Sequence, residues 1–171
     1  NFSPAAAAEA RLVRFGLITD THVSDKRDQA DTATINASAR YFSGGLAKIG
    51  EFADAMNASG AAFVAELGDF TDNPADAKLA YPQRKAAVVD FVTRAEAGLA
   101  RFKGPRYHVF GNHDTDQMSK QEYLGHLTNS GIAADASYYG FDQGGVRFLV
   151  LDASFKADGE SYSGVPGTAG A

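Results

Sequence analysis

The stretch YHVFGNHD, residues 107–114, joins a short apolar strand to a glycine turn that carries three adjacent polar side chains. Apolar residues followed by glycine are typical of a buried strand that leads into a tight turn. An amide, an imidazole and a carboxylate, at Asn112, His113 and Asp114, are costly to bury without partners. The stretch therefore predicts a strand end that faces a metal ion or an anionic substrate.

Two earlier segments of the chain follow the same plan. Residues 12–18 and 61–67 are mostly apolar, as expected for strands that are covered on both faces. Each is followed at once by acidic or histidine side chains, namely Asp20 and His22 after the first segment and Asp69 and Asp72 after the second.

Helical patterns separate these strands. Between residues 41 and 57 apolar residues recur at a spacing of three and four, and Gly60 suits the end of that helix. After a loop that extends to Pro82, a second amphipathic pattern runs to Phe102. Strand, helix, strand, helix, strand predicts an α/β fold with a parallel sheet.

The rest of the chain carries weaker signals. Ser119 can cap a short helix that ends near Leu127, and residues 138–141 and 146–151 are typical of an antiparallel hairpin. A length of 171 residues favours one domain. We expect a lead-in over residues 1–11, the domain over 12–156 and an irregular tail over 157–171.

Composition excludes several classes of partner. A net charge of −5 argues against binding to a nucleic acid duplex, and no apolar run approaches the roughly 20 residues that span a membrane. The absence of cysteine excludes thiol chemistry and disulfides. The small residues Ala5–Ala8 close to Asn1 favour a periplasmic or secreted location after removal of a signal peptide, although a trimmed start explains them equally well.

The three strand ends meet at one place if the sheet is parallel, because ligands collect at the carboxyl edge of open α/β sheets. Oxygen and imidazole ligands without sulfur suit manganese, iron or zinc. A carboxylate such as Asp69 could bridge two ions, which together activate a water molecule and bind both the attacking and leaving oxygens. Each motif alone also fits an ordinary turn in which the aspartate binds nearby amides.

The three motifs in this order resemble the calcineurin-like metallophosphoesterases over residues 13–154. The quoted features are Asp20-x-His22, Gly68-Asp69-x-x-Asp72 and Gly111-Asn112-His113-Asp114. Residues 40–42, 66–69, 107–110 and the hairpin are similar to the manganese-dependent ADP-ribose/CDP-alcohol diphosphatase branch. The resemblance implies an αββα sandwich and hydrolysis of a small phosphodiester, nucleoside diphosphate-linked or phosphomonoester substrate with two divalent or trivalent metal ions.

The resemblance also implies a role for each motif residue. The expected metal ligands are Asp20, His22, Asp69 as the bridging group, and Asn112. His113 would stabilise or protonate the leaving oxygen, with Asp72 and Asp114 as orienting groups.

One departure from the family pattern limits this interpretation. The family completes its site with later histidines, including a Gly-His-x-His motif, whereas no histidine follows residue 126 here. We therefore expect the N-terminal part of the sandwich, completed by a missing C-terminal segment or a second chain. The alternatives are a non-catalytic remnant that binds metal or phosphate, and a structural half that assembles with a partner.

Three further residues invite two interpretations each. His108 is expected to be a hydrogen-bonded core residue rather than a ligand. Glu66, inside an apolar strand, should pair with an arginine or face the floor of the site. Lys26 fits a solvated loop, although it could also reach a substrate phosphate.

Overall fold

The computed structural model describes residues 13–29, 40–163 and 165. The predicted lead-in over residues 1–11 lies outside the described residues. Residues 164 and 166–171 of the predicted tail also lie outside them.

A three-stranded parallel sheet forms the centre of the molecule. Its strands are β1 (Gly16–Ile18), β2 (Val64–Glu66) and β3 (Arg106–His108), in that spatial order. The hydrogen-bonded parts are shorter than the apolar segments of the sequence, but the parallel sheet is confirmed.

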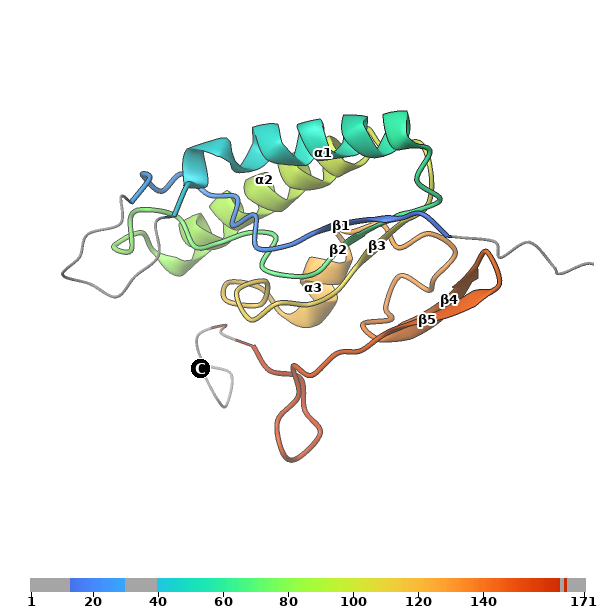
Figure 1. Cartoon of the computed structure of the whole chain (residues 1–171). Coiled ribbons are helices and arrows are strands. Elements are labelled where there is room, and N and C mark those ends of the chain that lie inside the picture. Colours follow the sequence, from blue (N-terminus) through green and yellow to red (C-terminus); the bar gives the residue numbers. More distant parts are fainter. Residues whose placement is uncertain (1–12, 30–39, 164, 166–171) are drawn as a thin grey trace, which may run out of the picture.

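Two helices cover one face of this sheet (Figure 1). The first, α1 (Gly45–Ser59), follows the short turn η1 (Phe42–Gly44) and ends at Gly60, as predicted, with this glycine in the left-handed conformation. The second, α2 (Tyr81–Leu99), begins earlier than expected. Pro82 lies in its first turn, where the missing N–H group costs no helical hydrogen bond, so the loop ends before this proline.

A short helix and a hairpin lie on the opposite side of the sheet (Figure 1). The helix is α3 (Lys120–Leu124), and Ser119 and Glu122 form the predicted capping box at its start. The hairpin consists of β4 (Tyr139–Gln143) and β5 (Val146–Val150), joined by two glycines with positive φ. Helices, parallel sheet and hairpin are thus stacked in layers, and the predicted α/β class is confirmed.

Alternation along β2 divides the core into two parts. Val64 points to the helix side, where it joins Ile49, Val92 and Leu99. Phe63 and Ala65, on either side of Val64, point to the hairpin side, as the two-residue period of a strand requires.

Aromatic rings fill the space between the sheet and the hairpin. The ring of Phe63 stacks on Phe15 with centroids 4.8 Å apart and meets the edges of Phe141 and Phe148. Tyr107 stacks on Phe141 in turn. These contacts fix the hairpin to the underside of the sheet.

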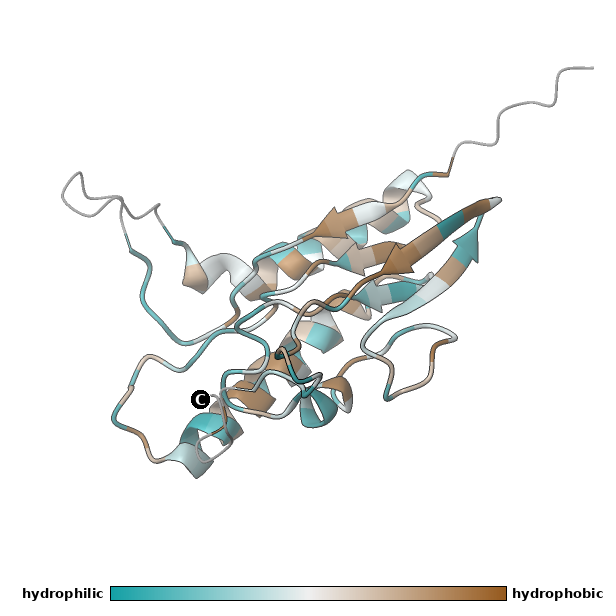
Figure 2. Ribbon diagram, turned by 90° about the horizontal axis from the view of Figure 1, so that it is seen from below, coloured by the Kyte–Doolittle hydropathy of each residue, from teal (hydrophilic) through white to brown (hydrophobic). Residues whose placement is uncertain are grey.

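Figure 2 shows how hydropathy varies along the chain. The strands β1 and β5 are mainly apolar, whereas β3 includes Arg106 and His108, and several of the loops around the sheet are hydrophilic. Within the described residues, no helix is both long and apolar enough to cross a membrane.

We predict that Phe63→Ala destabilises the fold by about 3–5 kcal/mol, because it removes the ring at the centre of the aromatic layer. Chemical denaturation of the variant measures this loss. Tyr138→Ala, at an exposed position beside the same hairpin, serves as the control and should cost less than about 1 kcal/mol. Equal effects of the two substitutions would contradict the assignment.

Candidate functional site

The loops that follow β1 and β2 run side by side beyond the end of the sheet. The N–H groups of Asp20 and His22 donate to the carbonyl oxygens of Gly68 and Asp69, at 3.0 and 2.9 Å. A further bond from the N–H of Val23 to the carbonyl of Phe70 continues the pairing. Parallel pairing therefore extends into both predicted motifs and brings them to one edge.

The loop after β3 crosses the loop after β2 at two glycines. Gly68 has a φ of 101°, and a Cβ atom placed on it would lie 2.5 Å from the backbone nitrogen of Gly111. A Cβ atom on Gly111 would overlap the backbone nitrogen and the side chain of Asp69. Only glycine fits at these two positions, because any side chain would separate the loops.

The buried carboxylate of Asp114 joins the same two loops. Its oxygens accept the N–H groups of Asp69, Phe70 and Gly111 at 3.1, 3.0 and 2.8 Å. The hydroxyl of Tyr123 donates a further bond at 2.9 Å. Burial raises the pKa of Asp114, although the N–H group of Gly111 acts in the opposite direction.

Backbone strain coincides with three of the four predicted metal ligands. Asp20, His22 and Asp69 have φ values of 54°, 43° and 54°, and they are the non-glycine residues with positive φ among those described. Each such residue costs roughly 1–3 kcal/mol and persists only where surrounding contacts fix it. The fold therefore stores strain at the positions that the motifs had singled out.

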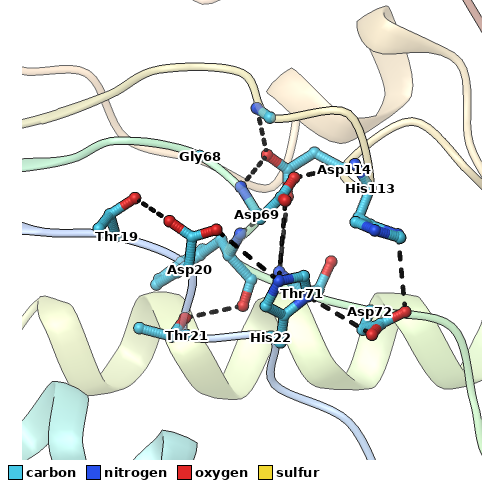
Figure 3. A network of polar contacts seen from close by, with 12 residues as sticks. Thr19, Asp20, Thr21, His22, Gly68, Asp69, Thr71, Asp72, His113 and Asp114 are labelled. Carbon is cyan, nitrogen blue, oxygen red and sulfur yellow. Dashed lines mark hydrogen bonds and ion pairs between the residues drawn. The ribbon is translucent and has the colours of Figure 1, made fainter. Parts of the chain in front are cut away.

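These three side chains lie close to one another (Figure 3). The Nε2 atom of His22 lies 3.9 Å from Oδ1 of Asp20 and 3.7 Å from Oδ2 of Asp69. Two ligands with bonds of about 2.0–2.2 Å to one ion can be separated by up to about 4.4 Å. His22, Asp69 and His113 each offer a ligand atom, and these atoms all lie within 4.8 Å of one another, which suits a transition-metal ion, whereas Asp20 lies outside this group.

Asp72 lies behind the two histidines in a buried position. One of its oxygens is 3.4 Å from Nδ1 of His22, and the other is 3.7 Å from Nδ1 of His113. Burial would raise the pKa of Asp72, but hydrogen bonding to Lys26 reverses the shift and lowers it. Lys26 binds this carboxylate at 2.8 Å, so its charge is paired within the fold although the loop around it is exposed.

His113 is fixed by two contacts. Its backbone N–H group donates to Oδ1 of Asp69 at 3.0 Å. Its ring nitrogen Nδ1 lies 3.0 Å from Oδ2 of Asp116. Sequence analysis missed Asp116, which lies two residues beyond the motif in a stretch with no distinguishing pattern. Asp72, His113 and Asp116 form a second group of side chains close enough to hold an ion.

Among the described residues, the side chain of Asn112 is the predicted ligand without a hydrogen bond or ion pair to the other predicted ligands. It lies on the turn between Gly111 and His113, and its side chain is exposed. Within the described part of the chain it makes no side-chain hydrogen bond, so its role stays a prediction.

A buried charged cluster lies beneath the site. Oε1 of Glu66 accepts the N–H group of Gly68 at 2.8 Å, and the other oxygen of Glu66 lies 3.6 Å from Nδ1 of His108. On the other side of the ring, Nε2 of His108 lies 3.0 Å from Oε2 of Glu96. The other oxygen of Glu96 binds Arg106. His108 is thus the buried, paired residue that we expected, whereas the partner of Glu66 is this histidine rather than an arginine.

The cluster shifts the protonation of both its central groups. Burial raises the pKa of Glu66 to about 7 in spite of the opposing effect of His108. Burial disfavours the imidazolium form of His108, but the two flanking carboxylates outweigh it and raise its pKa to about 9. Glu66 and Glu96 therefore favour the imidazolium form of His108.

Comparison with known proteins gives three findings. Residues 13–167 match the family model of calcineurin-like phosphoesterases. The manganese-dependent ADP-ribose/CDP-alcohol diphosphatase of Arabidopsis thaliana is 29% identical over 150 residues, which cover 86% of this chain and 44% of that protein. A dimetal phosphatase from Danio rerio has a similar fold, with a TM-score of 0.67 and 23% identity over 87% of this chain and 47% of that one. The chain thus spans about half the length of these relatives.

We predict that Gly111→Ala weakens Mn²⁺ binding roughly 10–100-fold, because the added methyl group displaces Asp69. Isothermal titration calorimetry of the intact protein measures the affinity. Gly44→Ala is the matched control, since a Cβ atom there meets nothing within 4 Å. An unchanged affinity in Gly111→Ala would show that the glycine crossing does not position the site.

A second prediction concerns the pH dependence of stability. The pKa of His108 is about 9 in the folded chain and 6.5 in its ordinary state, so the folded state holds the extra proton between these values. The free energy of unfolding should therefore fall by about 3 kcal/mol as the pH rises from 6.5 through 9.

Glu66→Gln should reduce this fall, because it removes a carboxylate that raises the pKa of His108 and keeps an oxygen for the N–H group of Gly68. Denaturation curves between pH 6 and 9 compare the two proteins. The same pH dependence in both would contradict the pairing of Glu66 with His108.

Proposed function

We propose that the cluster of Asp20, His22, Asp69 and His113 at the strand ends is the metal site of a hydrolase that cleaves phosphoric esters. The premise is that this chain belongs to the calcineurin-like phosphoesterase family. The family resemblance inferred from the three motifs is confirmed by the match over residues 13–167. The observation that carries the proposal is that His22, Asp69 and His113 come together at distances that suit a shared ion, with His22 and Asp69 in strained backbone conformations.

We propose that Asp20, His22, Asp69 and Asn112 would hold two metal ions at this site, with Asp69 shared between them. When bound, such ions neutralise charge on the phosphate oxygens and lower the pKa of a water molecule. The acidic side chains explain why cations are required, since they would otherwise repel an anionic substrate.

We assign two further roles in the site: Asp114 holds two loops together, and His113 supplies a proton. Asp114 keeps the loops of Asp69 and Gly111 together through their N–H groups. The ring of His113 lies beside that of His22, with centroids 5.1 Å apart, so it reaches the same region of space. We assign to His113 the proton that the leaving oxygen requires.

A cavity beside the cluster supports a nucleotide-sized substrate. It has a volume of about 400 Å³ and is lined by Asp20, His22, Arg40 and Tyr41, among others. The side chain of Tyr41 is 73% exposed and can stack on a base, and Arg40 carries the charge that a second phosphate would need. We therefore place nucleoside diphosphate-linked compounds first, as the name of the Arabidopsis relative suggests.

The proposal predicts that the intact protein hydrolyses bis(p-nitrophenyl) phosphate in the presence of Mn²⁺ and loses this activity in a chelator. Asp69→Ala and His113→Ala should each lower kcat/KM by roughly 10²–10⁴-fold. Asp90→Ala, on the exposed face of α2, serves as the control and should leave the rate unchanged. A parallel assay of ADP-ribose, CDP-choline, a cyclic nucleotide and p-nitrophenyl phosphate ranks the substrate classes.

Unchanged activity in Asp69→Ala and His113→Ala would reject the assignment of this site. Tight Mn²⁺ binding without turnover of any of these compounds would instead favour a domain that binds metal without catalysis.

A further inference from the structure

We propose that a second cavity, beside α1, is a subsite for the sugar of a nucleoside diphosphate-linked sugar. The inference rests on the proposed function, because it concerns the part of the substrate that lies beyond the diphosphate. The cavity and the residues that line it are features of the fold and do not depend on any activity.

Two cavities near the end of β1 share a wall. The first, in which the proposed function places the nucleoside, has a volume of about 400 Å³, and the second has a volume of about 520 Å³. Asp20, Thr21 and Tyr41 line both of them. Since Asp20 is one of the residues proposed to hold the metal ions, a diphosphate bound at this wall would extend one substituent into each cavity.

One side of α1 forms part of the second cavity. The residues that this helix contributes follow a spacing of three and four, which places them next to one another along the helix: Lys48, Glu51, Phe52 and Ala55. Ile18, at the end of β1, also lines the cavity. The cavity is therefore built from two regular elements, which hold its shape.

An exposed ion pair in this lining selects the chemistry of the occupant. Nζ of Lys48 lies 3.2 Å from Oε2 of Glu51. An ammonium group has three donors and a carboxylate has two acceptor oxygens, so the pair can bind neighbouring hydroxyl groups through both of its members. Glu51 would repel a phosphate and Lys48 would repel a quaternary ammonium group. A neutral group with several hydroxyls meets both a donor and an acceptor.

The apolar part of the lining suits the same occupant. Ile18 and Phe52 are half-buried and pack against the core on the helix side of the sheet, so their positions are fixed. Binding sites for small molecules usually combine such an apolar lining with a few polar groups that set the orientation of the ligand. The C–H faces of a sugar ring can pack against Phe52 while its hydroxyls reach Lys48 and Glu51.

Two compounds with the same nucleoside test the subsite in the intact protein with Mn²⁺. CDP-glucose carries a neutral sugar, whereas CDP-choline carries a quaternary ammonium group on the same diphosphate. We expect Lys48→Met to raise KM about 10-fold for CDP-glucose, because a hydrogen bond from a charged donor is lost. The same substitution should lower KM for CDP-choline, because it removes a repulsion, and kcat should stay unchanged for both compounds.

The controls separate recognition of the sugar from a general effect on the fold. Arg94→Met is the matched substitution, because Arg94 forms a similarly exposed ion pair with Asp90 on α2, and it should leave both KM values unchanged. Glu51→Gln should raise KM for both compounds, since it removes an acceptor for the sugar and leaves the charge of Lys48 uncompensated. A change of the same sign for both compounds in Lys48→Met, or no change for either, would overturn the proposal.

A binding measurement distinguishes this inference from the proposed function. The probe is an analogue of CDP-glucose with a methylene group between the phosphorus atoms, added to the Zn²⁺-loaded intact protein. It should shift the backbone amide NMR signals of Lys48 and Glu51, and CMP, which lacks the sugar, should not. If the wild type hydrolyses neither compound, the proposed function fails while these signals still decide the subsite. If the wild type is active but the analogue leaves these signals unchanged, the subsite is wrong and the proposed function stands.

Discussion

The geometry of this site depends on one buried carboxylate that binds the backbone of two loops. Asp114 accepts N–H groups from the adjacent residues Asp69 and Phe70 and from Gly111, which lies more than forty positions further along the chain. Charge-assisted bonds of this kind are the strong ones, and a buried carboxylate without them would be very costly. Because Asp114 occupies this position, the loops after β2 and β3 cannot move independently, and the two glycines that meet there have to remain glycines.

This constraint also explains how the strained residues persist. Asp20, His22 and Asp69 adopt conformations that other residues avoid, and the neighbouring backbone pairs hold the first two in place. The cost is offset by the sheet pairing that continues into the loops and by the packing beneath them. Strain and pairing thus bring the side chains of His22 and Asp69 close together, and with His113 their ligand atoms lie within 4.8 Å of one another.

The helices contribute to the site as well as to the core. Val92 and Leu99 of α2 pack against the sheet, while Arg84 of the same helix supports the hydrogen bonds that reach His113. Glu96 of α2 takes part in the buried charged cluster with His108 under the turn of Gly68. Stability and protonation beneath the site are therefore coupled, because removing one buried charge leaves its partner uncompensated.

The sequence by itself determined the order of strands and helices, the parallel sheet, the hairpin and the capped helix at Ser119. It also predicted that Asp20, His22, Asp69 and His113 come to one edge of the sheet, because parallel strands deliver their carboxyl ends to the same edge. The tertiary structure alone decided the partners of Glu66, Lys26 and Asp116, and it left Asn112 outside the contacts of the cluster. These partnerships depend on distances of a few ångströms between segments that are remote in the chain, and no local pattern of residue types encodes such distances.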